Sequence, residues 1–319
     1  MPPALARCKV GLTSLIFASC LISNTHATWE RANGAISWLH GTNVVWRFSF
    51  DTNRGKPFFH PLSVGSGPAL TNFKPEDHPW HYGLWFSWKY INKANYWEED
   101  RKTGRAEGVT RWAAPVIETK PDGSARITLE LEYVHPSGRV DLTETRKINV
   151  SAPNPDGSYT IDWLAEFTAG PEGAFLDRTP MPGEPGGQIN GGYAGLSLRL
   201  AGEPLGVSFV CSTGIVSRFE HDRARPSAPA LACNLTDGTN WVGSIAVLSD
   251  PANAGANPPW YIVNSQVMRF MCAAILAPKP LTLPPRGKLQ LRYRIIVGPK
   301  PWTPEALASV HANWLSAKP

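Results

Sequence analysis

The chain has little cysteine, little charge and no long run of basic residues. It contains five cysteines in 319 residues, and 18% of its residues are charged. The net charge of +5 comes from 31 basic and 26 acidic residues that are spread along the chain, so the sequence has no nucleic-acid footprint. A GxGxxG segment after a strand, a P-loop and a Gly-x-Ser-x-Gly elbow are also missing. Nucleotide cofactors and esterase chemistry therefore have no support.

The sequence also has no long apolar run. A short one lies near the start of the chain. Two basic residues precede an apolar run over residues 10–22, and small residues suited to a signal peptidase end at Ala27. The run is too short to anchor the chain in a membrane. We therefore predict a signal peptide over residues 1–27 and a soluble periplasmic or secreted protein over residues 28–319. A lipoprotein signal that ends at Cys20 is the alternative.

Removal of that leader would leave Cys211, Cys233 and Cys272. Three is an odd number, so at most one disulfide can form, with Cys211 and Cys233 as the closer couple. Three buried thiols are the other interpretation. Their flanks are not electropositive, so we predict no nucleophilic cysteine.

Turn residues and alternation indicate an all-β fold. Thirty prolines and 28 glycines occur without a repeat period. Residues 126–133 alternate apolar and polar side chains, as expected of a strand with one buried face. Further strands are expected within 36–50, 81–91, 140–150, 161–167, 196–200, 207–211, 241–248, 260–263, 267–275 and 289–297. We predict a single large antiparallel β-sandwich over residues 28–319, with a mutarotase-like supersandwich as one form of it. A short helix over residues 306–315 should follow a cap at Thr303.

Two opposite charges lie on an apolar face of the strand at 140–150. Glu144 and Arg146 share the parity of Leu142 and Ile148, which should point inward. A lone buried charge is expensive, so we predict that the two side chains are paired. We assign both to the catalytic site.

Three histidines lie in the aromatic segment over residues 56–99. His60 and His78 each precede a proline, which holds the backbone extended, and a turn at Pro79 could bring His81 to the same side as His78. We predict that His60, His78 and His81 converge as catalytic acids and bases. A divalent metal held by all three is the minority hypothesis, and otherwise no cofactor is predicted. A purely structural role in a proline-rich loop is the remaining alternative.

Aromatic and polar side chains nearby suit a sugar ligand. Trp80 and Trp97 are flanked by polar residues, and flat aromatic faces stack on pyranose rings. The remaining predicted substrate-binding residues are Asp77, Gln188, Asn190 and Arg199. The candidates for acid–base chemistry are Asp77, Glu98, Glu99, Asp100, Glu144 and Glu166.

Four segments of the chain form a recognisable set of motifs. They are Lys-Pro-Phe-Phe-His-Pro-Leu at 56–62, Asp-His-Pro-Trp-His-Tyr-Gly-Leu at 77–84, Leu-Thr-Glu-Thr-Arg at 142–146, and Asn-Trp-Val-Gly-Ser-Ile-Ala-Val-Leu-Ser-Asp-Pro at 240–251. Together they resemble the bacterial PmoA-like family, a domain of unknown function. The resemblance implies an exported β-sandwich protein that is often encoded beside genes for sugar breakdown. It also implies that His60, Asp77, His78, His81, Glu144 and Arg146 occupy recurrent positions of the family.

The chain departs from that family in two places. Tyr261 stands where the family pattern has a histidine, and residues 277–285 lack the usual aromatic and glycine pattern. The family name borrows from a membrane subunit of a methane monooxygenase. Nothing after Ile22 is long enough to span a bilayer, so we do not expect that activity.

These observations predict an exported enzyme that cleaves or modifies glycosides, with histidine and carboxylate groups in an aromatic cleft. A hydrolase, a lyase and an isomerase all fit. The alternative is a non-catalytic carbohydrate-binding protein. The expected partner is a carbohydrate or another small-molecule substrate, with no nucleic acid and no transmembrane segment.

Overall fold

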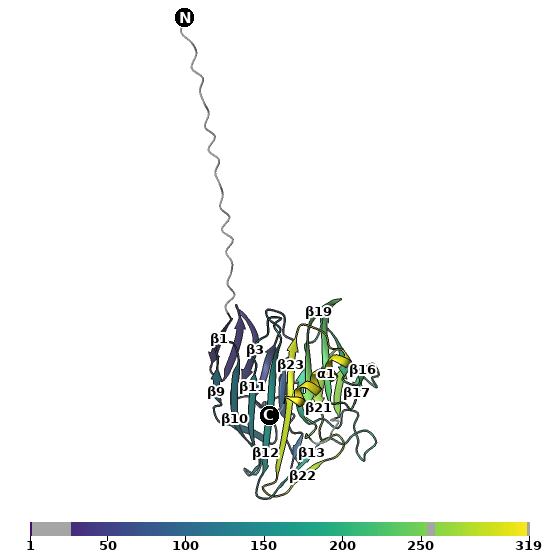
Figure 1. Cartoon of the computed structure of the whole chain (residues 1–319). Coiled ribbons are helices and arrows are strands. Elements are labelled where there is room, and N and C mark those ends of the chain that lie inside the picture. The colour runs from purple at the N-terminus through teal and green to yellow at the C-terminus, as the bar shows by residue number, and fades with distance from the viewer. Residues whose placement is uncertain (2–26, 254–258, 318–319) are drawn as a thin grey trace.

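Two large antiparallel sheets make up most of the computed structural model, which describes residue 1 and residues 27–253 and 259–317 (Figure 1). The first sheet has nine strands in the order β1-β2-β3-β4-β5-β14-β21-β20-β17. Their bounds are β1 (Ala27–Ala32), β2 (Ala35–His40), β3 (Asn43–Ser49), β4 (Phe58–Leu62), β5 (Leu84–Ser87), β14 (Gly195–Arg199), β21 (Arg269–Ala273), β20 (Trp260–Asn264) and β17 (Arg223–Ala224). The predicted signal peptide over residues 1–27 lies, apart from its two end residues, outside the described residues.

The second sheet has ten strands in the order β16-β15-β18-β19-β23-β12-β11-β10-β8, with β9 also paired to β10. Their bounds are β16 (Gly214–Val216), β15 (Gly206–Cys211), β18 (Ala230–Asp237), β19 (Asn240–Ser249), β23 (Lys288–Gly298), β12 (Tyr159–Ala169), β11 (Val140–Val150), β10 (Ala125–Val134), β8 (Val109–Trp112) and β9 (Val116–Thr119). A small four-stranded sheet contains β22 (Leu281–Leu283), β13 (Ala174–Asp177), β6 (Tyr90–Ile91) and β7 (Ala94–Asn95).

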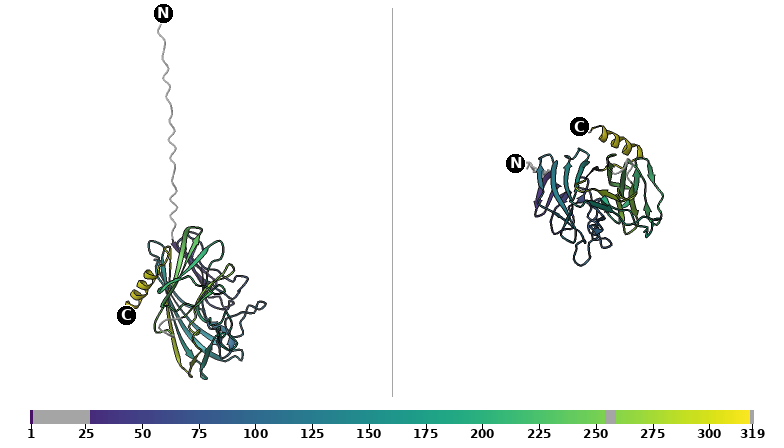
Figure 2. Two further views of the ribbon diagram at one scale, coloured as in Figure 1. Left: turned by 90° about the vertical axis from the view of Figure 1, so that its right-hand side faces the viewer. Right: turned by 90° about the horizontal axis from the view of Figure 1, so that it is seen from below.

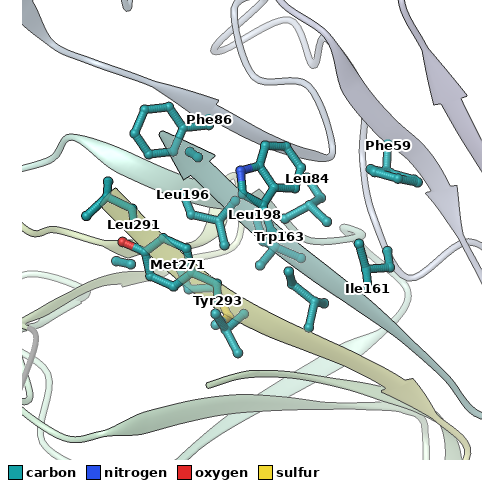
Figure 3. Close-up of a cluster of buried hydrophobic side chains, with 14 of the residues drawn as sticks. Phe59, Leu84, Phe86, Ile161, Trp163, Leu196, Leu198, Met271, Leu291 and Tyr293 are labelled. Atoms are coloured by element: carbon teal, nitrogen blue, oxygen red, sulfur yellow. The ribbon is translucent and has the colours of Figure 1, made fainter. Parts of the chain in front are cut away.

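The main core lies between the two large sheets. Strand β12 alternates buried and half-buried residues along its whole length, so every second side chain points into the core. Trp163 of β12 meets the inward side chains of the nine-stranded sheet, among them Leu84, Leu196 and Met271 (Figure 3). The predicted all-β antiparallel sandwich is therefore confirmed.

Helix α1 (Pro304–Ser316) packs on the outer face of the ten-stranded sheet (Figure 2). Thr303 caps it, because its side chain accepts a hydrogen bond from the Ala306 backbone N–H. Alanines 230, 232 and 246 allow the close approach of Leu307 and Trp314. The predicted cap and C-terminal helix are confirmed. No helix in the described part of the chain is long and apolar enough to cross a membrane.

The outer face of the nine-stranded sheet is also buried at its centre. In β5, β20 and β21, Trp85, Tyr261 and Phe270 point away from the main core and form a second apolar cluster. Loops that connect the strands cover this cluster, so these central strands carry buried side chains on both faces. The candidate site is built on this outer face.

All three described cysteines are buried and unpaired. Burial raises the pKa of each thiol to about 12, which keeps the thiols protonated. The interpretation as three buried thiols is confirmed, and the possible Cys211–Cys233 disulfide is absent.

Candidate functional site

A tight turn at Pro79 brings His78 and His81 together. The His81 backbone N–H donates to the His78 carbonyl at 3.0 Å, and the two imidazole rings stack with centroids 4.7 Å apart. The Lys74 backbone N–H donates to the His81 carbonyl at 2.8 Å, which ties the turn to the start of its loop. This part of the predicted convergence is confirmed.

Arg199 and Asp77 form an ion pair that orients His78. Asp77 accepts hydrogen bonds from Arg199 at 2.8 Å through both carboxylate oxygens, and its Oδ2 lies 2.7 Å from His78 Nδ1. Arg199 also donates to the Val267 carbonyl at 2.7 Å. Burial by itself would raise the pKa of Asp77, but the bonds from His78 and Arg199 outweigh it and lower that pKa. Asp77 is therefore an ionised acceptor that fixes the imidazole of His78.

His81 lies deeper and is held neutral. Burial, reinforced by the nearby charges of His78 and Arg199, lowers the pKa of His81 well below its usual value. Its ring stacks on Phe270 at 5.1 Å, and its Nδ1 is 3.5 Å from Arg199 Nη1. Because a guanidinium only donates, Nδ1 is the acceptor nitrogen and Nε2 carries the proton.

Glu98 supplies a carboxylate to the same site. Tyr193 donates its hydroxyl to Glu98 Oε1 at 2.6 Å, Asn95 Nδ2 donates to Oε2 at 2.8 Å, and Lys89 forms an ion pair with Oε2. Burial would raise the pKa of Glu98, but the charge and hydrogen bond of Lys89 outweigh it and lower that pKa. The carboxylate is therefore ionised at neutral pH.

These groups border a cavity of about 210 Å³, which we call the histidine cavity. Its lining combines flat aromatic faces with a few polar groups: His78, Trp80, His81, Trp97, Glu98, Asn190, Tyr193, Arg223, Tyr261, Met268 and Phe270. An apolar pocket with a few convergent polar groups is the usual form of a small-molecule site.

The predicted substrate-binding residues fall into three groups. Trp80, Trp97 and Asn190 line the histidine cavity. Asp77 and Arg199 stand behind it and position His78. Gln188 is exposed and does not line the cavity, so its assignment is corrected. The loop that carries Gln188 is held by hydrogen bonds within the loop itself. One of them runs from the Gln188 backbone N–H to the Pro180 carbonyl at 3.0 Å.

His60 does not join the other two histidines. Its Nδ1 lies 2.9 Å from Thr71 Oγ1, its ring stacks on Phe73 at 5.6 Å, and it does not line the histidine cavity. Across residues 27–253 and 259–317, no three His, Cys, Asp or Glu side chains form a group that could hold a metal. The predicted convergence of all three histidines, and the metal hypothesis built on it, are therefore corrected.

Glu144 and Arg146 are paired as predicted, but in the main core. Arg146 Nε and Nη2 donate to the two Glu144 oxygens at 2.6 and 2.9 Å, and Tyr133 donates to the same carboxylate at 2.6 Å. The guanidinium lies 4.7 Å from the centroid of the Trp163 ring. Both charged side chains are at most 1% exposed and neither lines the cavity, so their assignment as catalytic residues is corrected.

Sequence reasoning missed Arg223, Met268 and Phe270 as lining residues. Phe270 lies in an apolar run that is buried on both faces, so no alternation shows which side chains point outward. Tyr261 was visible only as a departure from the family pattern, and it lies in the cavity where a histidine was expected.

Several solved structures are similar to the chain at low identity. An α-galactosidase from Lactobacillus brevis is 10% identical with a TM-score of 0.44, covering 85% of this chain and 39% of its own. The GH36 α-galactosidase AgaB from Geobacillus stearothermophilus is 9% identical with a TM-score of 0.48, covering 86% of this chain and 41% of its own. The chain thus spans about two fifths of the length of these two enzymes. A putative aldose 1-epimerase from Klebsiella pneumoniae is 8% identical with a TM-score of 0.46, covering 88% of this chain and 83% of its own.

Comparison of sequences gives a family but no activity. No curated protein matches the chain. A family profile does match residues 35–312, and it describes a domain of unknown function, as the resemblance implied, although nothing links it to PmoA. The chain therefore belongs to DUF6807, a family of unknown function.

Proposed function

We propose that the protein is an exported enzyme, periplasmic or secreted, that cleaves or modifies a glycoside in the histidine cavity. The observation that carries the proposal is the Arg199–Asp77–His78 chain, which ends at an aromatic cavity that also holds the ionised Glu98. Such an arrangement orients an imidazole for proton transfer and leaves aromatic faces for a sugar ring.

His78 is the proposed general acid and base. Its Nδ1 faces Asp77 at 2.7 Å, so Nδ1 donates to the carboxylate and Nε2 is left to exchange a proton with the ligand. Glu98 is the proposed second group, which accepts a hydrogen bond from a sugar hydroxyl or stabilises positive charge that develops on the ring. Tyr193 and Lys89 hold Glu98 in its ionised form.

The cavity size favours one sugar ring. Its volume of about 210 Å³ is smaller than the roughly 300–1,000 Å³ of sites for drug-sized ligands. Trp80 and Trp97 offer flat faces, and Asn190 offers an amide that can bond to hydroxyls.

Turnover of a saccharide library by the purified protein, with and without chelator, tests this proposal. His78→Gln keeps a polar side chain but loses the titratable ring, and we expect it to reduce turnover about 10²- to 10⁴-fold while binding is retained. His135→Gln is the matched control, because His135 is a half-buried histidine in the β10–β11 turn that does not line the histidine cavity. Equal turnover in both variants would contradict the role of His78.

A non-catalytic carbohydrate-binding protein is the second candidate, and the aromatic lining of the cavity favours it equally. In that case the protein would bind a saccharide without releasing product, and His78→Gln would change affinity only. The same library, measured for binding and for product, separates the two candidates.

Export is tested by the intact mass of the protein recovered from its host. We expect a mature chain that starts near Thr28, close to the first residue of β1 at Ala27. A diacylglyceryl group on Cys20 would show that the alternative lipoprotein signal is used instead.

A further inference from the structure

A second, larger hollow lies beside the histidine cavity. This cleft of about 920 Å³ is bordered by the loop at 182–189 and by residues 211–226, and Arg223 lines both the cleft and the histidine cavity. A ligand that extends from the cavity into the cleft would therefore pass Arg223.

Two arginines at this junction lack an acidic partner. Arg223 Nε donates to the Tyr261 hydroxyl at 3.1 Å and its Nη1 to the His221 carbonyl at 2.6 Å. Arg225 Nη2 donates to the Ile189 carbonyl at 2.8 Å, and its guanidinium carbon lies 4.4 Å from the centroid of the Tyr261 ring. Within residues 27–253 and 259–317, neither arginine forms an ion pair with a carboxylate.

The charge of Arg225 is under-compensated. Its Nη1 is buried and has no hydrogen-bond partner. Burial lowers the pKa of Arg225, which shows that the protein surroundings disfavour its cationic form. Arg225 itself lines the cleft, and a guanidinium without a carboxylate partner suits an oxyanion, which accepts charge-assisted hydrogen bonds.

Two other charged groups near this junction already have partners. Arg218, which also lines the cleft, pairs with Glu220 at 3.2 Å. Glu98 in the histidine cavity is paired with Lys89. Arg223 and Arg225, which have no carboxylate partner, both contact Tyr261, one at its hydroxyl and the other over its ring.

We propose that Arg223 and Arg225 form an anion subsite that binds the carboxylate or sulfate group of an acidic saccharide whose ring occupies the histidine cavity. This inference rests on the proposed function of the cavity and narrows its substrate class to acidic sugars. Guanidinium groups suit such planar or tetrahedral oxyanions because their N–H donors form a rigid fork.

Calorimetric titration with matched ligands tests the subsite. The probes are methyl β-glucoside, methyl β-glucuronide, a sulfated methyl glucoside and inorganic sulfate. We expect an acidic sugar to bind at least about tenfold more tightly than methyl β-glucoside, the effect of one charge-assisted hydrogen bond. Preference for the glucuronide or for the sulfated sugar identifies the anion. Added salt should weaken only the acidic ligands.

Variants separate the subsite from the cavity. Arg223→Gln and Arg225→Gln should remove the preference for the acidic sugar, while Arg218→Gln, the control from the same cleft, should keep it. Arg225→Lys retains the charge and should keep part of the preference if Arg225→Gln fails to fold.

The outcomes also distinguish this inference from the proposed function. Equal affinity for neutral and acidic sugars, or equal loss in Arg218→Gln, would overturn the anion subsite and leave the sugar site intact. Binding of sulfate that depends on Arg225, with no sugar bound, would support the subsite and overturn the sugar site. No binding of any probe would overturn both.

Discussion

His60 is half-buried and His81 is buried, and only His81 borders the cavity. Burial, aided by the charge of Arg47, lowers the pKa of His60 to about 4. An unfolded histidine titrates near pH 6.5, so between these values the unfolded state binds more protons than the native state. The contribution of His60 to the free energy of unfolding is therefore complete above about pH 6.5, and it is lost as the pH drops toward 4.

We expect His60 to contribute roughly 3 kcal/mol to this acid-induced loss, because each pKa unit is worth about 1.4 kcal/mol. His60→Gln can keep the hydrogen bond to Thr71, and it should flatten the curve of unfolding free energy against pH between 6.5 and 4. His81 shifts in the same direction, so part of the slope should remain. His135→Gln is the control from a surface turn. A His60→Gln curve of unfolding free energy against pH that is identical to wild type would refute the neutral state of His60.

The Glu144–Arg146 pair of β11 should be far more important for stability than an exposed pair that joins β11 to β12. Loss of either partner leaves a buried charge, and we expect Glu144→Gln or Arg146→Gln to reduce the free energy of unfolding by about 3–5 kcal/mol. The outward pair Lys147–Glu166, at 2.7 Å and more than 40% exposed on both sides, is the control. Lys147→Gln should cost at most about 1 kcal/mol in urea unfolding. Similar losses of unfolding free energy in the variants of the two pairs would contradict the burial of Glu144 and Arg146.

Sequence parity placed Glu144 and Arg146 correctly on an inward face and as a pair. It could not say which layer they enter, because a strand has the same period whether its inner face meets a core or a ligand site. The cavity lies instead on the outer face of the other sheet, where loops cover it. The turn at Pro79 was predictable because a proline fixes its local geometry, whereas the distance from His60 depends on packing between strands.

At the scale of elements, strands buried on both faces were the hardest to recognise. Residues 230–237 form β18, for which no strand was predicted. Leu231 and Cys233 face the main core while Ala230 and Ala232 lie under α1, so the segment reads as one apolar run. The ends of strands with one solvent-exposed face, such as β10, were predicted to within two residues.

The loop between β13 and β14 should control access to the cavity through its glycines. A Cβ at Gly191 would lie 1.9 Å from the Pro180 carbonyl oxygen, so Gly191→Ala must displace the loop next to Asn190 and Tyr193. We expect about tenfold weaker saccharide binding and a loss of about 1–3 kcal/mol in stability. Gly183→Ala meets no atom within 4 Å and is the control, with only the strain of its φ of +90°. Unchanged affinity in Gly191→Ala would exclude a role of this loop in binding.

At the scale of the whole molecule, the two large sheets use their outer faces differently. Helix α1 covers the outer face of the ten-stranded sheet, and the nine-stranded sheet carries the histidine cavity on its own outer face. The all-β class followed from composition and alternation, but the order of the strands did not, because β5, β14 and β21 pair across more than 70 residues of sequence. That pairing places Phe270, which lines the cavity, directly opposite Arg199, which positions His78 through Asp77.

A crystal structure with a saccharide from the library is the most direct test of the central claim. We predict a sugar ring in the histidine cavity, stacked on an aromatic face, with one of its oxygens about 2.6–3.2 Å from His78 Nε2 and another within hydrogen-bond distance of Glu98. A sugar bound elsewhere on the protein, with His78 and Glu98 touching no ligand atom, would contradict the account.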